Sequence, residues 1–294
     1  MASTMYHTLI SPSELAPHLA QEDWVVIDCR FDLGDPGQGE QMFLEAHIPG
    51  SRYAHLDRDL SGEKSGANGR HPLPTPPQMR ERFGAFGIAP GRQVVVYDAD
   101  AGMYASRLWW MLRFMGHDTV ALLDGGLARW TREGHATRGG REQWRPATFV
   151  GAPRDAWRLD AGAVAEGLHD PARVLVDARA ESRFRGENET LDKKAGHIPG
   201  ARSFFFQRNL ADDKTFKSAG ELQALWLGVL GDAQPEHVVM YCGSGVTACH
   251  NLLAMEHAGL GGARLFPGSW SEWSADPTRP VSLEPTDTID PRRT

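Results

Sequence analysis

One cysteine stands where an apolar segment meets a helical pattern. The stretch HVVMYCGSGVTACHN, residues 237–251, passes from apolar residues into Cys242 and then into a glycine-containing loop. Glycines allow successive backbone N–H groups to turn inward, and the N-terminus of a following helix carries partial positive charge. Both effects favour an anion, so we expect a reactive Cys242 thiolate. The N–H groups that could hold an anionic substrate group or an added sulfur belong to Gly243, Ser244, Gly245, Val246 and Thr247.

The other two cysteines have less chemical promise. Cys29 follows a predicted strand and Cys249 lies inside a predicted helix, so both are expected to be packing residues. An odd number of cysteines without a C-x-x-C pair argues against a disulfide framework and a structural zinc site. We therefore expect no metal and no organic cofactor. The alternative for Cys242 itself is a small buried residue without chemistry, the commoner fate of a free cysteine.

A thiolate in an anion-binding loop suits few reactions. A phosphatase of the C-x5-R type needs an arginine directly after the five loop residues, to clamp phosphoryl oxygens. That position is Ala248, which excludes this chemistry. A cysteine protease would need a histidine base with its own orienting group, and no such motif is evident. Transfer of a sulfur atom remains, with the thiolate attacking a sulfane sulfur and holding it as a persulfide.

The chain repeats itself, which sets the fold class. Four pairs of segments match in the same order at offsets of 143–150 residues: WVVIDCR with RVLVDAR, EAHIPGSR with AGHIPGAR, VVVYDADAGMYAS with VVMYCGSGVTACH, and LLDGGLARW with LFPGSWSEW. The sequence therefore predicts two copies of one domain, at residues 1–138 and 157–294, with a linker at 139–156. The first copy has Asp98 at the position of Cys242, so we expect it to be the inactive one.

Short apolar runs alternate with helical patterns in each copy. In the second copy the expected strands are 173–177, 237–241 and 263–266, and the expected helices are 160–168, 220–230 and 247–258, the last ending at Gly259. This alternation predicts an α/β fold with a small parallel sheet flanked by helices in each copy. Ligands bind such sheets at the carboxyl ends of their strands, where Cys242 lies.

The composition limits the classes of binding partner that we expect. The chain has 294 residues, 41% hydrophobic and 23% charged, with a net charge of −7. An acidic chain without a basic run is not expected to bind nucleic acid or an anionic membrane surface. No apolar stretch approaches a membrane span, and the opening MASTMYHTLI lacks the features of a secretory signal. We expect a cytoplasmic protein.

These motifs in combination resemble those of the two-domain rhodanese sulfurtransferases. The resemblance rests on tandem repeats with DAR and GHIPGAR, a lone loop cysteine in the second copy, and GSWSEW after it. It covers nearly the whole chain and implies two α/β domains, of which only the second is active. The loop CGSGVT resembles the 3-mercaptopyruvate sulfurtransferases, because thiosulfate-preferring members tend to place an arginine or lysine inside this loop.

The resemblance also implies roles for individual residues. Asp57 and His71 match a proposed relay that, together with Ser244, moves protons at the site. Arg183 matches the arginine that binds the substrate carboxylate. The family's second carboxylate-binding arginine is missing between Arg183 and GHIPG, where Lys193 or Lys194 could substitute. The implied acceptors are small thiols, thioredoxin or cyanide.

Two alternatives stay open at this point. The first is a thiosulfate:cyanide sulfurtransferase, which would use the same thiolate with a different donor. The second is a non-catalytic binding module of the rhodanese type, which Cys242 in its glycine loop argues against.

Overall fold

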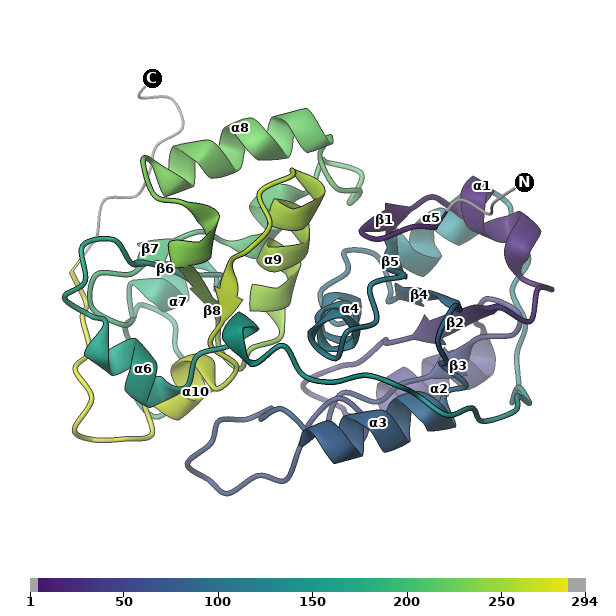
Figure 1. The fold of residues 1–294 in the computed structure, drawn as a ribbon, viewed down its shortest axis with the longest axis horizontal. Coiled ribbons are helices and arrows are strands. Elements are labelled where there is room, and N and C mark those ends of the chain that lie inside the picture. Colours follow the sequence, from purple (N-terminus) through teal and green to yellow (C-terminus); the bar gives the residue numbers. More distant parts are fainter. Residues whose placement is uncertain (1–4, 285–294) are drawn as a thin grey trace. The chain divides into compact units, whose positions relative to one another are not determined.

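The computed structural model describes residues 5–284, which form two compact α/β units (Figure 1). The first unit contains the described residues up to Gly62, with Pro74–Arg154 and Asp212–Phe216. The second contains Glu63–Leu73, Asp155–Ala211 and the described residues from Lys217 onward. Each unit therefore includes a short segment from the other sequence copy. We call Glu63–Leu73 the first arm and Asp212–Phe216 the second arm. The predicted boundaries at 138 and 157 remain predictions.

The first unit is built on a five-stranded parallel sheet in the order β1-β5-β4-β2-β3. Its strands are β1 Leu9–Ile10, β2 Trp24–Asp28, β3 Arg52–Tyr53, β4 Gln93–Tyr97 and β5 Val120–Leu123. Its helices are α1 Pro12–Leu15, α2 Gln38–Glu45, α3 Pro76–Ala85, α4 Ala105–Phe114 and α5 Gly126–Arg132. Every residue of β2, β4 and β5 is buried, as expected for parallel strands covered on both faces.

The second unit is built on a four-stranded parallel sheet in the order β7-β6-β8-β9. Its strands are β6 Val174–Asp177, β7 Arg202–Ser203, β8 Val238–Tyr241 and β9 Arg264–Leu265. Its helices are α6 Ala161–Glu166, α7 Glu181–Phe184, α8 Ala219–Leu230, α9 Thr247–His257 and α10 Ser269–Trp273. The predicted strands and helices of this copy are confirmed, and Gly259 follows the end of α9 with φ of 75°.

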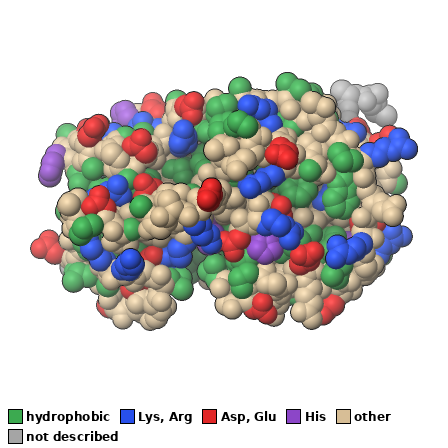
Figure 2. Space-filling view, turned by 90° about the horizontal axis from the view of Figure 1, so that it is seen from below, with side chains coloured by type: hydrophobic (Ala, Val, Ile, Leu, Met, Phe, Trp, Pro, Cys, Tyr) green, Lys and Arg blue, Asp and Glu red, His purple; other side chains and the backbone are tan. Residues whose placement is uncertain are grey.

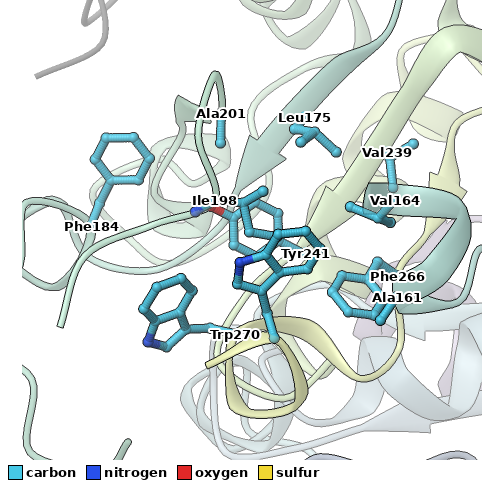
Figure 3. Packing of buried hydrophobic residues seen from close by; sticks show 11 residues of the cluster. Ala161, Val164, Leu175, Phe184, Ile198, Ala201, Val239, Tyr241, Phe266 and Trp270 are labelled. Carbon is cyan, nitrogen blue, oxygen red and sulfur yellow. The ribbon is translucent and has the colours of Figure 1, made fainter. Parts of the chain in front are cut away.

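Alternating side chains of the second sheet fill two layers. Leu175, Val239 and Tyr241 point to one face, where α6 and α10 cover them (Figure 3). Their neighbours along β8 point to the opposite face, against which α9 packs, with α8 beside it (Figure 1). Both faces of the sheet are therefore buried. This leaves the carboxyl end of β8 as the place where a ligand can meet polar groups.

The repeated DCR and DAR motifs prove to be equivalent structural pairs. Arg30 donates from Nε and Nη2 to the Asp28 carboxylate at 2.9 and 2.7 Å. Arg179 donates to Asp177 in the same way at 3.0 and 2.7 Å. All four residues are buried, so each charge is compensated by its bidentate partner.

The repeated HIPG motifs are structural as well. His47 stacks on Phe43 with ring centroids 4.0 Å apart, and His197 stacks on Phe184 at 3.7 Å. Nδ1 of each histidine is hydrogen-bonded to the backbone oxygen of the phenylalanine on which it stacks. The histidine of each motif is thus held against the helix that precedes it, α2 or α7.

Charged side chains of both signs are interspersed on the face shown in Figure 2. No helix within residues 5–284 combines the length and apolar character needed to span a membrane. The cytoplasmic location remains a prediction.

Candidate active site

Cys242 directly follows β8 and is 2% exposed. Its N–H donates to Ser269 Oγ at 3.1 Å, and its carbonyl accepts from the Trp270 N–H at 2.9 Å. The next carbonyl, of Gly243, accepts from the Ser271 N–H at 2.9 Å. The first turn of α10 therefore fixes the backbone on both sides of the thiol, which explains why the GSWSEW segment accompanies the cysteine loop.

Gly245 brings its backbone onto the sulfur. The Gly245 N–H donates to Cys242 Sγ at 3.2 Å, in the way expected of an anion-binding loop. Its φ is 74°, and a Cβ at this position would lie 2.2 Å from the Pro267 oxygen. Only glycine fits here, because any side chain would meet both a disfavoured backbone conformation and a carbonyl.

Cys249 and Cys29 lie where packing residues were expected. The Cys249 thiol is buried in α9 and donates to the Gly245 carbonyl at 3.4 Å, so it buttresses the loop. Cys29 is buried after β2, and burial raises the pKa of its thiol well above the ordinary range. A Cys29 thiolate is therefore disfavoured at neutral pH.

Ser244 and His71 are brought together beside the thiol. Ser244 Oγ and His71 Nδ1 are hydrogen-bonded at 2.8 Å, and both residues are buried. His71 belongs to the first arm, which is part of the second unit. Asp57 belongs to the first unit, where its N–H donates to His55 Nδ1 at 3.1 Å. The pairing of serine with histidine is thus visible, and the role of Asp57 stays a prediction.

Two guanidinium groups adjoin the cysteine loop. A Cβ placed on Gly243 would lie 2.7 Å from Arg70 Nη2 and 3.5 Å from Arg183 Nη1. Arg183 comes from α7 and Arg70 comes from the first arm, and the carboxylate-binding role of Arg183 stays a prediction. Two planar cations next to a nucleophile are suited to holding a carboxylate bidentately.

The lysines considered as substitutes have different positions. Lys194 Nζ donates to the Asp276 carbonyl at 3.1 Å, so its cation is engaged in the fold. Lys193 is exposed and lines a cleft of about 260 Å³ that also contains Lys64, Arg70, Asp192 and Ser271. Arg70, rather than either lysine, is therefore the second cation that adjoins Gly243 beside Arg183.

The arginines next to the cysteine loop are already paired with carboxylates of the chain. Glu189 accepts from Arg183 at 2.9 Å and from Arg179 at 3.2 Å. Asp192 accepts from Arg183 at 3.3 Å and also pairs with Arg70. Burial disfavours the charged form of Glu189, but hydrogen bonds from the Leu191 N–H and from Arg183 outweigh it, so the pKa of Glu189 is lowered.

Sequence reasoning missed Ser269, Arg70 and Asp192. Ser269 has φ of 53°, and the equivalent residue of the first copy is Gly126, with φ of 56°. A serine in a conformation that suits glycine indicates that its hydroxyl is needed, here to accept from the Cys242 N–H. The repeat alignment contains this signal. For Arg70 and Asp192, spacing alone gave no indication of their meeting.

The first copy fills its equivalent loop with its own anion. Asp98, at the position of Cys242, accepts from the N–H groups of Gly102, Tyr104 and Ala105 at 2.8–3.1 Å. Burial raises the pKa of Asp98, although these three bonds act in the opposite direction. The loop that could have held a substrate anion is thus closed by an internal carboxylate.

Comparison with known proteins settles the family. A profile described as "Rhodanese-like domain" matches residues 11–133 and again residues 160–276. The chain belongs to the rhodanese-like family. A protein described as "Probable 3-mercaptopyruvate sulfurtransferase" from Pseudomonas aeruginosa is 45% identical over 276 residues, which cover 93% of this chain and 97% of the relative.

Two further rhodanese-like relatives span most of the chain. A thiosulfate sulfurtransferase of Cricetulus griseus is 32% identical over 281 residues, which cover 92% of each chain. The solved 3-mercaptopyruvate sulfurtransferase from Leishmania major has a TM-score of 0.81 and 32% identity, covering 91% of this chain and 74% of that one. The predicted family, fold class and sulfurtransferase class are confirmed, which argues against a non-catalytic module.

Within residues 5–284, no three His, Cys, Asp or Glu side chains are grouped so that they could hold a metal ion.

Proposed function

We propose that this chain is a 3-mercaptopyruvate sulfurtransferase that carries the transferred sulfur as a Cys242 persulfide. The observation that carries the proposal is the 2.8 Å hydrogen bond between Ser244 and His71 beside the thiol. A hydroxyl paired with imidazole can move a proton near neutral pH, and the mercaptopyruvate reaction needs a proton for its leaving group. The similarity to the Pseudomonas aeruginosa and Leishmania major proteins supports the same donor.

Donor binding places a carboxylate between Arg183 and Arg70. Both guanidiniums adjoin Gly243, so a short α-keto acid held by them has its sulfur within reach of the neighbouring Cys242. Fixing the carboxylate and the nucleophile in one geometry supplies much of the rate enhancement expected of such an enzyme. Lys193 borders the same cleft and contributes positive potential at its entrance.

The transfer step exchanges one bond to sulfur for another. The Cys242 thiolate attacks the donor's thiol sulfur, a sulfur–sulfur bond forms, and the carbon–sulfur bond breaks with its electron pair going to carbon. The products are a Cys242 persulfide and the enolate of pyruvate. The proton that the donor's sulfur carried passes to the enolate carbon through Ser244 and His71, giving pyruvate and an anionic persulfide. Asp57 stays a predicted member of this relay.

The loop then stabilises the intermediate. The Gly245 N–H that donates to Sγ, and the N–H groups of Gly243, Ser244, Val246 and Thr247, favour negative charge on the persulfide. An acceptor thiolate attacks the outer sulfur, the sulfur–sulfur bond to Cys242 breaks, and the Cys242 thiolate is restored. Small thiols, the dithiol of thioredoxin, and cyanide are acceptors of suitable chemistry.

Thiosulfate is the second candidate donor. The two guanidiniums at Gly243 would also pair with a dianion, and the similarity to the Cricetulus griseus protein favours it. The loop residues 243–247 themselves carry no cation, however, and sulfite leaves as a stable anion that needs no relay.

The test is a comparison of kcat/KM for the two donors with the wild-type chain and with Cys242→Ser. We expect mercaptopyruvate to be preferred by at least about tenfold, which is roughly 1.4 kcal/mol of transition-state stabilisation. Cys242→Ser should be inactive with both. A preference for thiosulfate would overturn the donor and leave the nucleophile in place. Turnover by Cys242→Ser would overturn the persulfide mechanism.

A further inference from the structure

Asp192 occupies the place where a donor carboxylate would be held. One of its oxygens, Oδ1, pairs with Arg70 Nη1, and the other, Oδ2, lies 3.3 Å from Arg183 Nη2. A single carboxylate therefore bridges the two guanidiniums that adjoin Gly243. The Asp192 side chain is 4% exposed, so this is an interior contact and not a loose surface ion pair.

The loop is built to present this side chain inward. Glu189 Oε1 accepts from the N–H groups of Leu191 and Asp192 at 2.9 and 3.1 Å, which forms a tight turn. Leu191 is half exposed on the outside of that turn, while Asp192 points to the arginines. The turn thus directs Asp192 toward the arginines, and Arg183 also donates to Glu189 Oε1, the oxygen that closes the turn, at 2.9 Å.

The pairing of Asp192 with the two arginines affects the charge balance of the site. Arg179 is paired with Asp177 and Glu189, Arg183 with Glu189 and Asp192, and Arg70 with Asp192. These three cations are thus matched by three carboxylates of the chain itself. A donor carboxylate that entered beside all of them would bring an uncompensated negative charge into a buried region, which is costly.

We propose that Asp192 is an internal competitor for the donor carboxylate, released from Arg70 and Arg183 when the donor binds. The proposal rests on the proposed function only in placing a carboxylate at these two arginines. The apparent affinity for the donor equals the intrinsic affinity multiplied by the fraction of time that Asp192 is displaced. Asp192 therefore sets KM and excludes anions that cannot replace both of its ion pairs.

The experiment removes the charge of Asp192 and keeps its shape. With Asp192→Asn we expect KM for mercaptopyruvate to fall about tenfold, with kcat changed by less than about twofold, because the site is vacant for more of the time. The constant for competitive inhibition by pyruvate should fall by a similar factor. Glu187→Gln removes an exposed carboxylate that pairs with Arg185 in the same loop, and its KM should equal that of the wild type.

A second readout does not require turnover. Pyruvate should protect the Cys242 thiol from iodoacetamide, and the half-protecting concentration should be lower for Asp192→Asn and for Asp192→Ser than for the wild type. Failure of the proposed function would appear as absent mercaptopyruvate turnover in the wild type, with this protection series still measurable. Thermal unfolding identifies a variant that has lost its fold, and the other substitution then gives the answer.

Three results would overturn the proposal. A KM that rises in Asp192→Asn would mean that Asp192 only orients Arg70 for binding. An unchanged KM and half-protecting concentration would mean that the bridge does not compete with the donor. A complete lack of protection by pyruvate in every folded variant would mean that no carboxylate binds at this pair of arginines.

Discussion

At the scale of single residues, the thiol depends on backbone groups that other side chains hold in place. Ser269 Oγ accepts from the Cys242 N–H and donates to the Phe266 carbonyl at 2.9 Å, while Gly245 supplies the N–H that reaches the sulfur. Neither residue is a nucleophile, a base or a cation. The reactivity proposed for Cys242 is thus set by the conformation of its neighbours, which a search for reactive side chains does not find.

Gly245→Ala should abolish turnover and lower the free energy of unfolding by roughly 1–3 kcal/mol, since the new Cβ combines a strained conformation with a clash. The contact at 2.2 Å is with a carbonyl, which cannot rotate away. The matched control is Gly259→Ala, which has a nearly identical φ of 75° and nothing within 4 Å of its Cβ. Urea unfolding and the rate of Cys242 alkylation measure both effects. Equal losses in the two variants would mean that the clash is unimportant.

Ser244→Ala should separate the two donors. We expect kcat for mercaptopyruvate to fall about a hundredfold or more, because an enolate must be protonated. Turnover of thiosulfate should fall far less, because sulfite leaves without a proton. Steady-state kcat with both donors measures the difference. The double variant Ser244→Ala/His71→Gln should lose no more than either single variant, since the two residues act as one relay. Equal losses with both donors would contradict this role.

Much of the candidate site could be predicted at this scale, for identifiable reasons. Cys242 and its loop lie in a repeated segment, so alignment of the two copies with each other locates them, whereas Arg183 and the role of Ser244 were implied by the resemblance to the rhodanese sulfurtransferases. Arg70 and Asp192 are 122 residues apart in the chain, and no periodicity brings them together. Arg70 and Asp192 pair only because the first arm packs in the second unit, and tertiary contacts rather than local sequence determine where this arm packs.

At the scale of elements, the segment from α7 to Lys194 holds arginine side chains in position. Arg179 and Arg183 flank the start and the end of the α7 turn, and Glu189 joins them from the following loop. The Arg179 guanidinium also lies over the Trp270 ring of α10, 4.8 Å from its centroid. The loop thus links the cation cluster to the helix that anchors Cys242, and its length is constrained at both ends.

The lowered pKa of Glu189 predicts that the free energy of unfolding depends on this residue's titration only at acidic pH. Because the folded pKa lies below the ordinary 4.5, the contribution of Glu189 is fully present above the unfolded pKa and is lost as pH falls through the folded value. Glu189→Gln should therefore lower the free energy of unfolding at neutral pH and flatten its fall below about pH 4.5.

Urea unfolding from pH 7 to pH 3 measures this dependence. Glu187→Gln, which removes an exposed carboxylate from the same loop, controls for the loss of one negative charge. If Glu189→Gln keeps the full acid dependence of the wild type, other carboxylates are responsible for it. A stabilised variant at neutral pH would mean that the buried charge costs more than its partners return.

The elements themselves followed from the sequence because their signals are local. Apolar runs such as VVVY and VVMY are long enough to define buried strands, and capping residues mark the helices, as Ser218 does for α8. The expected strand 263–266 is real but has only two residues, Arg264–Leu265. No local pattern predicted that each arm belongs to the compact unit of the other copy. Both arms are irregular loops, and an irregular loop carries no periodic signal that shows where it packs.

At the scale of the whole molecule, the two arms lie at equivalent places in the two copies. Both follow the HIPG motif and precede the strand that leads to Asp98 or Cys242. The first arm is tied to α10 where the Arg70 N–H donates to Ser271 Oγ at 3.0 Å. The second arm is tied to the first unit where the Phe216 N–H donates to Asp124 Oδ1 at 2.8 Å. Each copy's sequence thus completes the other copy's compact unit.

Replacing the first arm should therefore disable a site whose thiol lies elsewhere in the sequence. With Glu63–Leu73 exchanged for a Gly-Ser segment of equal length, kcat/KM should fall to the level of Arg70→Gln/His71→Gln, because those side chains are lost. The same exchange of Asp212–Phe216 should affect thermal unfolding more than kcat/KM. Steady-state assays and melting curves of the two variants give the comparison. Full activity without the first arm would exclude a role for Arg70 and His71.

The exchange of arms has a consequence for dividing the chain. A cut between the two sequence copies would separate Cys242 from Arg70 and His71, because the first arm belongs to the first copy's sequence and to the second unit. The half that has Asp98 in place of a cysteine therefore cannot be removed without also removing side chains that contact the cysteine loop.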